Sequence, residues 1–156
     1  MRGKILIVED FGDWRDLLVG LLQREGHSVE AVATAQDARD YIKGVQHLDL
    51  TIFDIRLVET DETNEDGMQL LAEMREQQPF TRVIMITGHG TMELQRRAFR
   101  QLHAFDFFRK EEFDSDEFRS AVREAVEDAA RERRASKNHD YMRGHHYAAW
   151  QREKKE

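Results

Sequence analysis

The sequence predicts an α/β domain: a doubly wound parallel sheet of five strands in the order 2-1-3-4-5, flanked by five helices. Two observations predict it. Short apolar runs alternate with amphipathic stretches five times along the chain, and the runs are apolar along most of their length. Strands of this kind are buried on both faces, as in a parallel sheet covered by helices.

Five segments have the length and composition of strands, and four of them are followed by polar residues. Their β-branched and aromatic content favours extended backbone. The predicted strands are Lys4–Val8, Ser28–Val32, Leu50–Phe53, Arg82–Ile86 and Ala104–Phe108.

Between and after these strands, apolar residues recur at helical spacing. The helices are predicted around Trp14 to Leu22, Ala35 to Val45, Leu70 to Met74, Leu94 to Leu102, and Phe118 to Val126. Gly26 is placed to end the first helix, and Pro79 closes the third. Asp114 and Glu117 have the spacing of a capping box for the fifth helix.

The pattern changes near residue 131. The stretch 131–156 holds eight Lys or Arg and four Asp or Glu, without a clear apolar period. We therefore divide the chain into a domain over 1–130 and a charged C-terminal extension over 131–156. We expect this extension to continue the last helix and then to form a tail.

Composition excludes several function classes. The 156 residues suit one domain, and the net charge of −7 argues against direct nucleic-acid binding. The absence of cysteine excludes disulfides, thiolate catalysis and cysteine-bound zinc. The sequence has no apolar run of membrane-spanning length and no signal peptide, so we expect a cytoplasmic protein without membrane insertion.

The polar residues at the strand ends have complementary chemistry. The first strand is followed by Glu9 and Asp10, the third ends at Asp54, the fourth ends at Thr87, and Lys110 follows the fifth. These ends share one edge of a parallel sheet, where ligands bind. Clustered carboxylates attract a hard cation such as Mg²⁺, and a carboxylate is able to attack phosphorus.

Five short motifs together resemble the receiver domain of two-component response regulators, over roughly residues 4 to 130. The motifs are Ile7-Val8-Glu9-Asp10, Phe53-Asp54-Ile55-Arg56-Leu57, Asp66-Gly67, Ile86-Thr87-Gly88-His89-Gly90 and Asp106-Phe107-Phe108-Arg109-Lys110. Each motif alone is weak, and their order and spacing form the signal. The resemblance implies a flavodoxin-like fold.

The resemblance also implies roles at the sheet edge. Asp54 is the expected phosphoacceptor, and Lys110 is expected to pair with a phosphate oxygen. Glu9, Asp10, Asp54 and the backbone carbonyl of Arg56 are expected to hold Mg²⁺. The phosphoryl donor would be a phosphohistidine on a sensor histidine kinase or a histidine phosphotransfer protein.

Two further residues resemble the switch of this family. Thr87 is expected to hydrogen-bond the phosphate, and Phe107 to turn inward on activation. The output would then pass to an unknown downstream protein, or to a homodimer, through the face formed by the fourth helix, fifth strand and fifth helix. We expect a signalling switch that catalyses only its own phosphorylation and dephosphorylation, rather than an enzyme.

The sequence departs from the family pattern at three places. Val58 stands where proline is usual, and an acidic insertion over 59–66 follows it. This insertion is either a solvated loop or an element that controls access to Asp54. Glu111 replaces a proline after Lys110, which predicts a trans bond. His103 replaces a glycine, which predicts either a strained φ at this residue or a different turn.

Two alternative functions are compatible with parts of this pattern. An aspartate-nucleophile phosphatase needs a second Asp two residues after the nucleophile, where this chain has Arg56. A pseudo-receiver, which binds partners without phosphorylation, is the remaining alternative. The combination of Asp10, Asp54, Thr87 and Lys110 favours a phosphorylated receiver over it.

Overall fold

The computed structural model describes residues 2–54, 66–88 and 92–154. Of residues 66–69, 94 and 138–154 it describes the backbone only. Its centre is a five-stranded parallel sheet in the order β2-β1-β3-β4-β5, as predicted. The strands are β1 Lys4–Val8, β2 Ser28–Val32, β3 Leu50–Asp54, β4 Arg82–Thr87 and β5 Asp106–Arg109.

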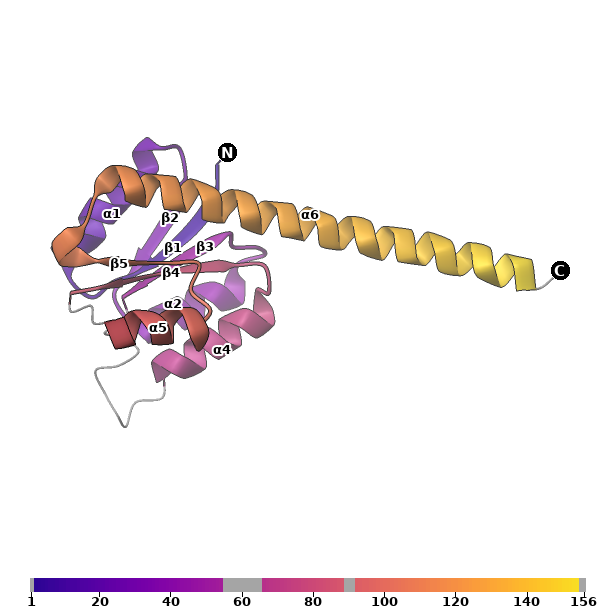
Figure 1. The fold of residues 1–156 in the computed structure, drawn as a ribbon, viewed down its shortest axis with the longest axis horizontal. Coiled ribbons are helices and arrows are strands. Elements are labelled where there is room, and N and C mark those ends of the chain that lie inside the picture. Colours follow the sequence, from indigo (N-terminus) through magenta and orange to yellow (C-terminus); the bar gives the residue numbers. More distant parts are fainter. Residues whose placement is uncertain (1, 55–65, 89–91, 155–156) are drawn as a thin grey trace.

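Helices cover both faces of the sheet (Figure 1). They are α1 Gly12–Arg24, α2 Ala35–Gly44, α4 Asp66–Gln77, α5 Met92–Arg100 and α6 Ser115–Lys154, with a short 3₁₀ helix, η1, at Lys110–Glu112. The predicted stop at Gly26 is confirmed: its φ is 90°, and its N–H donates to the carbonyl of Gln23 at 2.9 Å. Only a residue without Cβ adopts this conformation freely.

Each strand contributes to two cores because its side chains alternate between the faces. In β1, Ile5 and Ile7 pack with α1 and α6, whereas Leu6 and Val8 pack with residues of α2, α4 and α5. All four side chains are fully buried. This two-sided burial explains why the strands read as apolar runs.

The strand β5 begins two residues later than predicted. His103 has a φ of 53°, which confirms the expected strain at this non-glycine position. The N–H of the next residue, Ala104, donates to the carbonyl of Ala98 at 3.0 Å. Ala104 therefore completes the turn after α5 instead of pairing in the sheet.

The last helix, α6, has 40 residues and projects beyond the body of the domain (Figure 1). Asp114 caps its start, since its carboxylate accepts the N–H groups of Asp116 and Glu117 at 2.9 and 3.1 Å. The helix continues to Lys154, through the stretch where the sequence predicted an extension of the last helix followed by a tail. Neither α6 nor any other described helix has an apolar stretch long enough to cross a bilayer.

Ion pairs hold α6 against the sheet at the edge where the strands begin. Arg82 of β4 donates to Asp128 at 2.7 Å, and Arg133 pairs with Asp49, which precedes β3. These contacts reach past residue 130. The domain boundary predicted there stays a prediction.

Candidate functional site

Four strands bring polar side chains to the opposite edge of the sheet, where the strands end. Val8 of β1 is in register with Phe53 of β3, so Glu9 and Asp54 follow on neighbouring strands. Asp54 in turn is in register with Ile86 of β4, one residue before Thr87. The convergence expected from the sequence is therefore present in the structure.

Three of these polar side chains, those of Glu9, Asp54 and Thr87, are almost completely enclosed. Each has 1% relative exposure. Burying a carboxylate costs free energy unless a cation or hydrogen bonds compensate for it. For Asp54 a cation is present, because Lys110 Nζ lies 3.5 Å from its Oδ2.

Three carboxylates gather at this edge. Glu9, Asp10 and Asp54 each place one oxygen within 4.8 Å of the other two. Glu9 and Asp54 are buried, and Asp10 is exposed. This arrangement gives an oxygen-only ligand set of the kind that hard divalent cations prefer, and the exposed Asp10 leaves it open to solvent on one side.

Glu9 is the most constrained member of this acidic cluster. Its Oε1 accepts the N–H of Phe11 at 3.1 Å and the ammonium of Lys110 at 3.0 Å. Its Oε2 is buried and has no hydrogen-bond partner among the described residues. Burial raises the pKa of Glu9, and the negative charge of Asp54 raises it further, whereas the hydrogen bond from Lys110 lowers it. An unpaired buried carboxylate oxygen fits a site for a metal ion.

Lys110 joins the acidic cluster to the strand end of β5. It begins η1, and no cis peptide bond occurs in the described residues, so the bond before Glu111 is trans as predicted. Its ammonium also lies 5.4 Å from the ring centroid of Trp14. From the sequence, Trp14 was expected only on the core face of a helix. Its position in the first helical turn after Glu9 and Asp10 is the signal that could have indicated its contact with Lys110.

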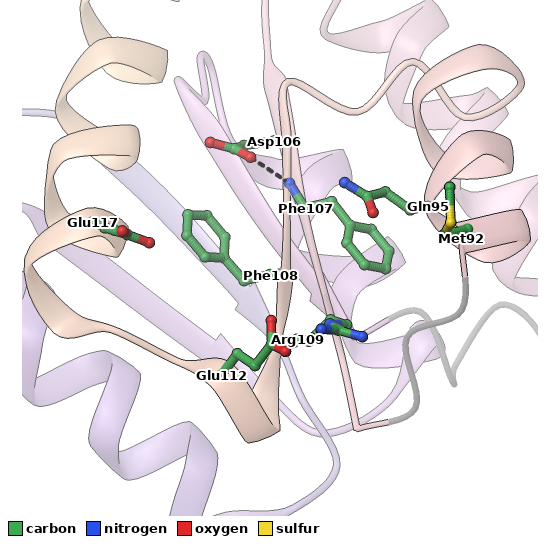
Figure 2. A pocket seen from close by; sticks show the side chains of 8 residues that line it. All are labelled: Met92, Gln95, Asp106, Phe107, Phe108, Arg109, Glu112 and Glu117. Atoms are coloured by element: carbon green, nitrogen blue, oxygen red, sulfur yellow. Dashed lines mark hydrogen bonds and ion pairs between the residues drawn. The ribbon is translucent and has the colours of Figure 1, made fainter.

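Phe107, the expected aromatic switch, is buried with 8% exposure. Figure 2 shows it on the α5 side of β5, whereas Phe108 lies on the α6 side. Phe107 also lines a pocket of about 530 Å³ on the face formed by α5, β5 and α6. Met92 and Phe99 of α5 are exposed, at 79% and 40%.

Some expected features lie outside the described residues. They are Arg56, the loop residue Val58, most of the acidic insertion and His89. The metal contact expected from the Arg56 carbonyl, and the role of the insertion, therefore stay predictions.

A family model described as the response regulator receiver domain matches residues 5–123. The chain belongs to the response regulator receiver family. Receiver domains accept phosphoryl groups in two-component signalling and have histidine kinases as partners. This receiver is thus a component of a signalling protein, with an acidic pocket of the kind that holds Mg²⁺ in the family.

Relatives with this receiver domain differ in length. The chain is 32% identical to the nitrogen assimilation regulatory protein NtrX of Azorhizobium caulinodans over 81% of its own length and 27% of that protein. It is 30% identical to the transcriptional regulatory protein FixJ of Bradyrhizobium diazoefficiens, over 82% and 58%. It therefore spans less than two thirds of both. It also covers 93% of the sporulation initiation phosphotransferase F of Bacillus subtilis, at 31% identity over 79% of this chain.

Solved structures agree with the fold. The structure of NtrX from Brucella abortus with ADP matches with a TM-score of 0.74 at 34% identity, covering 88% of this chain and 29% of that one. A CheY-like receiver domain protein from Methanospirillum hungatei matches with a TM-score of 0.69 at 25% identity, over 85% and 99%.

Proposed function

We propose that this receiver accepts a phosphoryl group on Asp54 and thereby switches its contacts with other proteins. The donor is a phosphohistidine of a sensor histidine kinase or a histidine phosphotransfer protein. One observation carries the proposal: the buried Asp54 carboxylate lies 3.5 Å from Lys110, within the cluster that includes Glu9 and Asp10.

The residues of this site account for the transfer. A carboxylate oxygen of Asp54 forms the new bond to phosphorus while the bond from phosphorus to the histidine nitrogen breaks. The donor imidazole leaves with the electron pair of that bond and takes up a proton. Lys110 offsets the charge on the phosphoryl oxygens, and we assign Thr87, buried on the adjacent strand, as a hydroxyl donor to one of them.

Glu9, Asp10 and Asp54 fit a Mg²⁺ ion. The buried, unpartnered Oε2 of Glu9 supports this assignment, as does the oxygen-only chemistry of the cluster. When bound, Mg²⁺ supplies positive charge that screens the carboxylates from the phosphoryl oxygens.

The output surface that we propose is the face of α5, β5 and α6. Its exposed Met92 and Phe99 and the pocket beside Phe107 support binding of a second copy of the chain. Thr87 and Phe107 link this face to Asp54, since both lie on strands that end at the site. Sedimentation with and without beryllofluoride tests the idea: dimerisation should require Asp54 and be lost in Met92→Glu.

The experiment that tests phosphoryl acceptance is intact mass spectrometry after incubation with acetyl phosphate and Mg²⁺. The wild type should gain one phosphoryl group, Asp54→Asn should gain none, and Asp13→Asn should behave as wild type. Asp13 is a matched control because it is an exposed carboxylate in the first turn of α1. A wild type that gains no phosphoryl group, and does not respond to beryllofluoride, would instead be a pseudo-receiver that binds partners without phosphorylation.

A further inference from the structure

The indole of Trp14 lies beside the ammonium of Lys110. Trp14 is in the first turn of α1, and its ring centroid is 5.4 Å from Lys110 Nζ. A cation within about 6 Å of an indole ring is attracted by the negative charge of the ring face. Lys110 therefore has an aromatic partner in addition to its two carboxylates.

Other rings fix the orientation of Trp14. Phe113 packs edge-to-face against it at 5.2 Å with an interplanar angle of 85°. Phe113 also contacts Phe118 at 5.2 Å, and Phe118 is fully buried at the start of α6. The half-buried indole is thus held by the core and is not free to follow the lysine.

The contact with Trp14 matters because the Lys110 side chain is long and flexible. Lys110 carries its charge on a flexible four-carbon chain at the start of η1, where Phe113 N–H donates to the Lys110 carbonyl at 3.3 Å. In this structure the ammonium is nearer to Glu9, at 3.0 Å, than to Asp54, at 3.5 Å. A phosphate oxygen on Asp54 would compete with Glu9 for the ammonium, so the ammonium would be able to exchange one oxygen partner for the other.

We propose that Trp14 is a positioning residue that keeps the Lys110 ammonium beside Asp54 during this exchange. The ring attracts the cation by its face and does not demand a particular N–H direction. The ammonium is therefore able to rotate from one oxygen partner to another while its distance from the site is kept. This inference rests on the proposed role of Asp54 as phosphoacceptor.

Two variants of the full chain test the inference. Trp14→Leu removes the aromatic face and keeps an apolar side chain, and Trp14→Phe keeps a weaker face. We expect the rate of phosphorylation by acetyl phosphate to fall about three- to tenfold in Trp14→Leu and less in Trp14→Phe. Circular dichroism and urea unfolding establish that each variant is folded.

A double-mutant cycle separates positioning from a general structural effect. In a Lys110→Gln background, Trp14→Leu should cause no further loss of rate, because the ring then has no cation to hold. Equal losses in the presence and absence of Lys110, or a Trp14→Leu rate equal to wild type, would overturn the inference.

Nuclear magnetic resonance gives a readout that does not depend on phosphorylation. The ε-methylene protons of Lys110 should be shifted upfield by the indole ring current, and this shift should disappear in Trp14→Leu. An upfield-shifted lysine in a wild type that takes no phosphoryl group would contradict the proposed function and support the contact. A lysine without the shift would overturn the contact whatever the phosphorylation result.

Discussion

Arg133 of α6 forms an ion pair with Asp49, a residue 84 positions earlier that directly precedes β3. Asp49 is buried, and its second carboxylate oxygen accepts the N–H of Lys4 at 2.8 Å. The Asp49 carbonyl accepts the N–H of Arg82 at 3.0 Å. One residue thus connects β1, β4 and α6 at the edge opposite the acidic cluster.

We predict that Arg133→Ala lowers the free energy of unfolding by about 1.5 kcal/mol, because the buried Asp49 loses a charged hydrogen-bond donor. Urea denaturation measures the change. Arg131→Ala is the matched control, since Arg131 is two positions away, is 69% exposed and pairs with Asp128 at 3.5 Å. Its effect should be below about 0.5 kcal/mol. Equal effects of the two substitutions would contradict a structural role for the Arg133 pair.

Gly3 tests the packing of α6 on the first strand. A Cβ at Gly3 would lie 2.6 Å from both methyl carbons of Val126, so Gly3→Ala should lower the free energy of unfolding by about 1–3 kcal/mol. Gly44→Ala is the control, because nothing lies within 4 Å of a Cβ there. Adding Val126→Ala to Gly3→Ala should restore part of the stability. Thermal unfolding of Gly3→Ala, Gly44→Ala and the double variant measures these differences. A neutral Gly3→Ala would mean that α6 does not pack here as described.

His27 should make stability depend on pH. Burial lowers the pKa of His27 from its usual 6.5. The negative charges of Glu25 and Asp49 raise this pKa in part, and the positive charge of Arg123 lowers it slightly further. Its Nδ1 accepts the N–H of Gly3 at 2.9 Å, a bond that protonation of this nitrogen would break.

The sign follows from proton binding. Below about pH 6.5 the unfolded chain binds a proton at this histidine that the folded chain resists, so stability falls as pH falls toward the folded pKa. The slope is at most about 1.4 kcal/mol per pH unit. In urea unfolding between pH 5 and pH 8, His27→Asn should have a flatter profile than wild type. His47→Asn, at an exposed position, should keep the wild-type profile. A His27→Asn profile as steep as that of the wild type would show that groups other than His27 cause the loss of stability in acid.

Mg²⁺ should stabilise the folded chain through the acidic cluster. A ligand at ten times its dissociation constant adds about 1.4 kcal/mol if only the folded state binds it. Differential scanning calorimetry with and without Mg²⁺, at matched ionic strength, should show a higher midpoint in wild type and in Asp13→Asn. Glu9→Gln and Asp10→Asn should respond less. An unchanged response in Asp10→Asn would place the ion at another site.

The apolar pattern was sufficient to predict most of the sheet. β1 and β2 have the predicted bounds: β1 is a buried apolar run that stops before Glu9, and β2 is a segment of alternating polarity whose residues are exposed or partly buried. The strand ends also placed Glu9, Asp54 and Lys110 at one edge, because in a parallel sheet all the strand ends share that edge. Local sequence was a poorer guide at β5, where the turn at His103 determines the start of the strand.

Long-range contacts between charged side chains could not be predicted. The partners Asp49 and Arg133 have no common spacing, and Arg133 lies in a stretch of mixed charge without an apolar period. Beyond this residue nothing in the pattern marked a helix face, so the sequence predicted an extension of the last helix without showing where it ends and a tail begins. Alanine, arginine, glutamate and lysine are nevertheless strong helix formers, and α6 continues to Lys154. The contact between Trp14 and Lys110 could not be predicted for the same reason: the two elements that carry these residues are far apart in the sequence and meet only in the folded chain.

Because α6 is one continuous helix, the direction in which its far end faces depends on the number of residues in the helix. Arg133 fixes the rotation of the helix relative to the sheet, and Lys154 is 21 residues further along the same helix. At 3.6 residues per turn, each residue inserted or deleted between them would rotate the far end by about 100° and move it by about 1.5 Å. Insertions of about seven residues would nearly restore the direction, and insertions of two would turn the far end to the opposite side. Length changes in α6 should therefore affect the angular placement of its far end periodically, while the phosphorylation site stays unchanged.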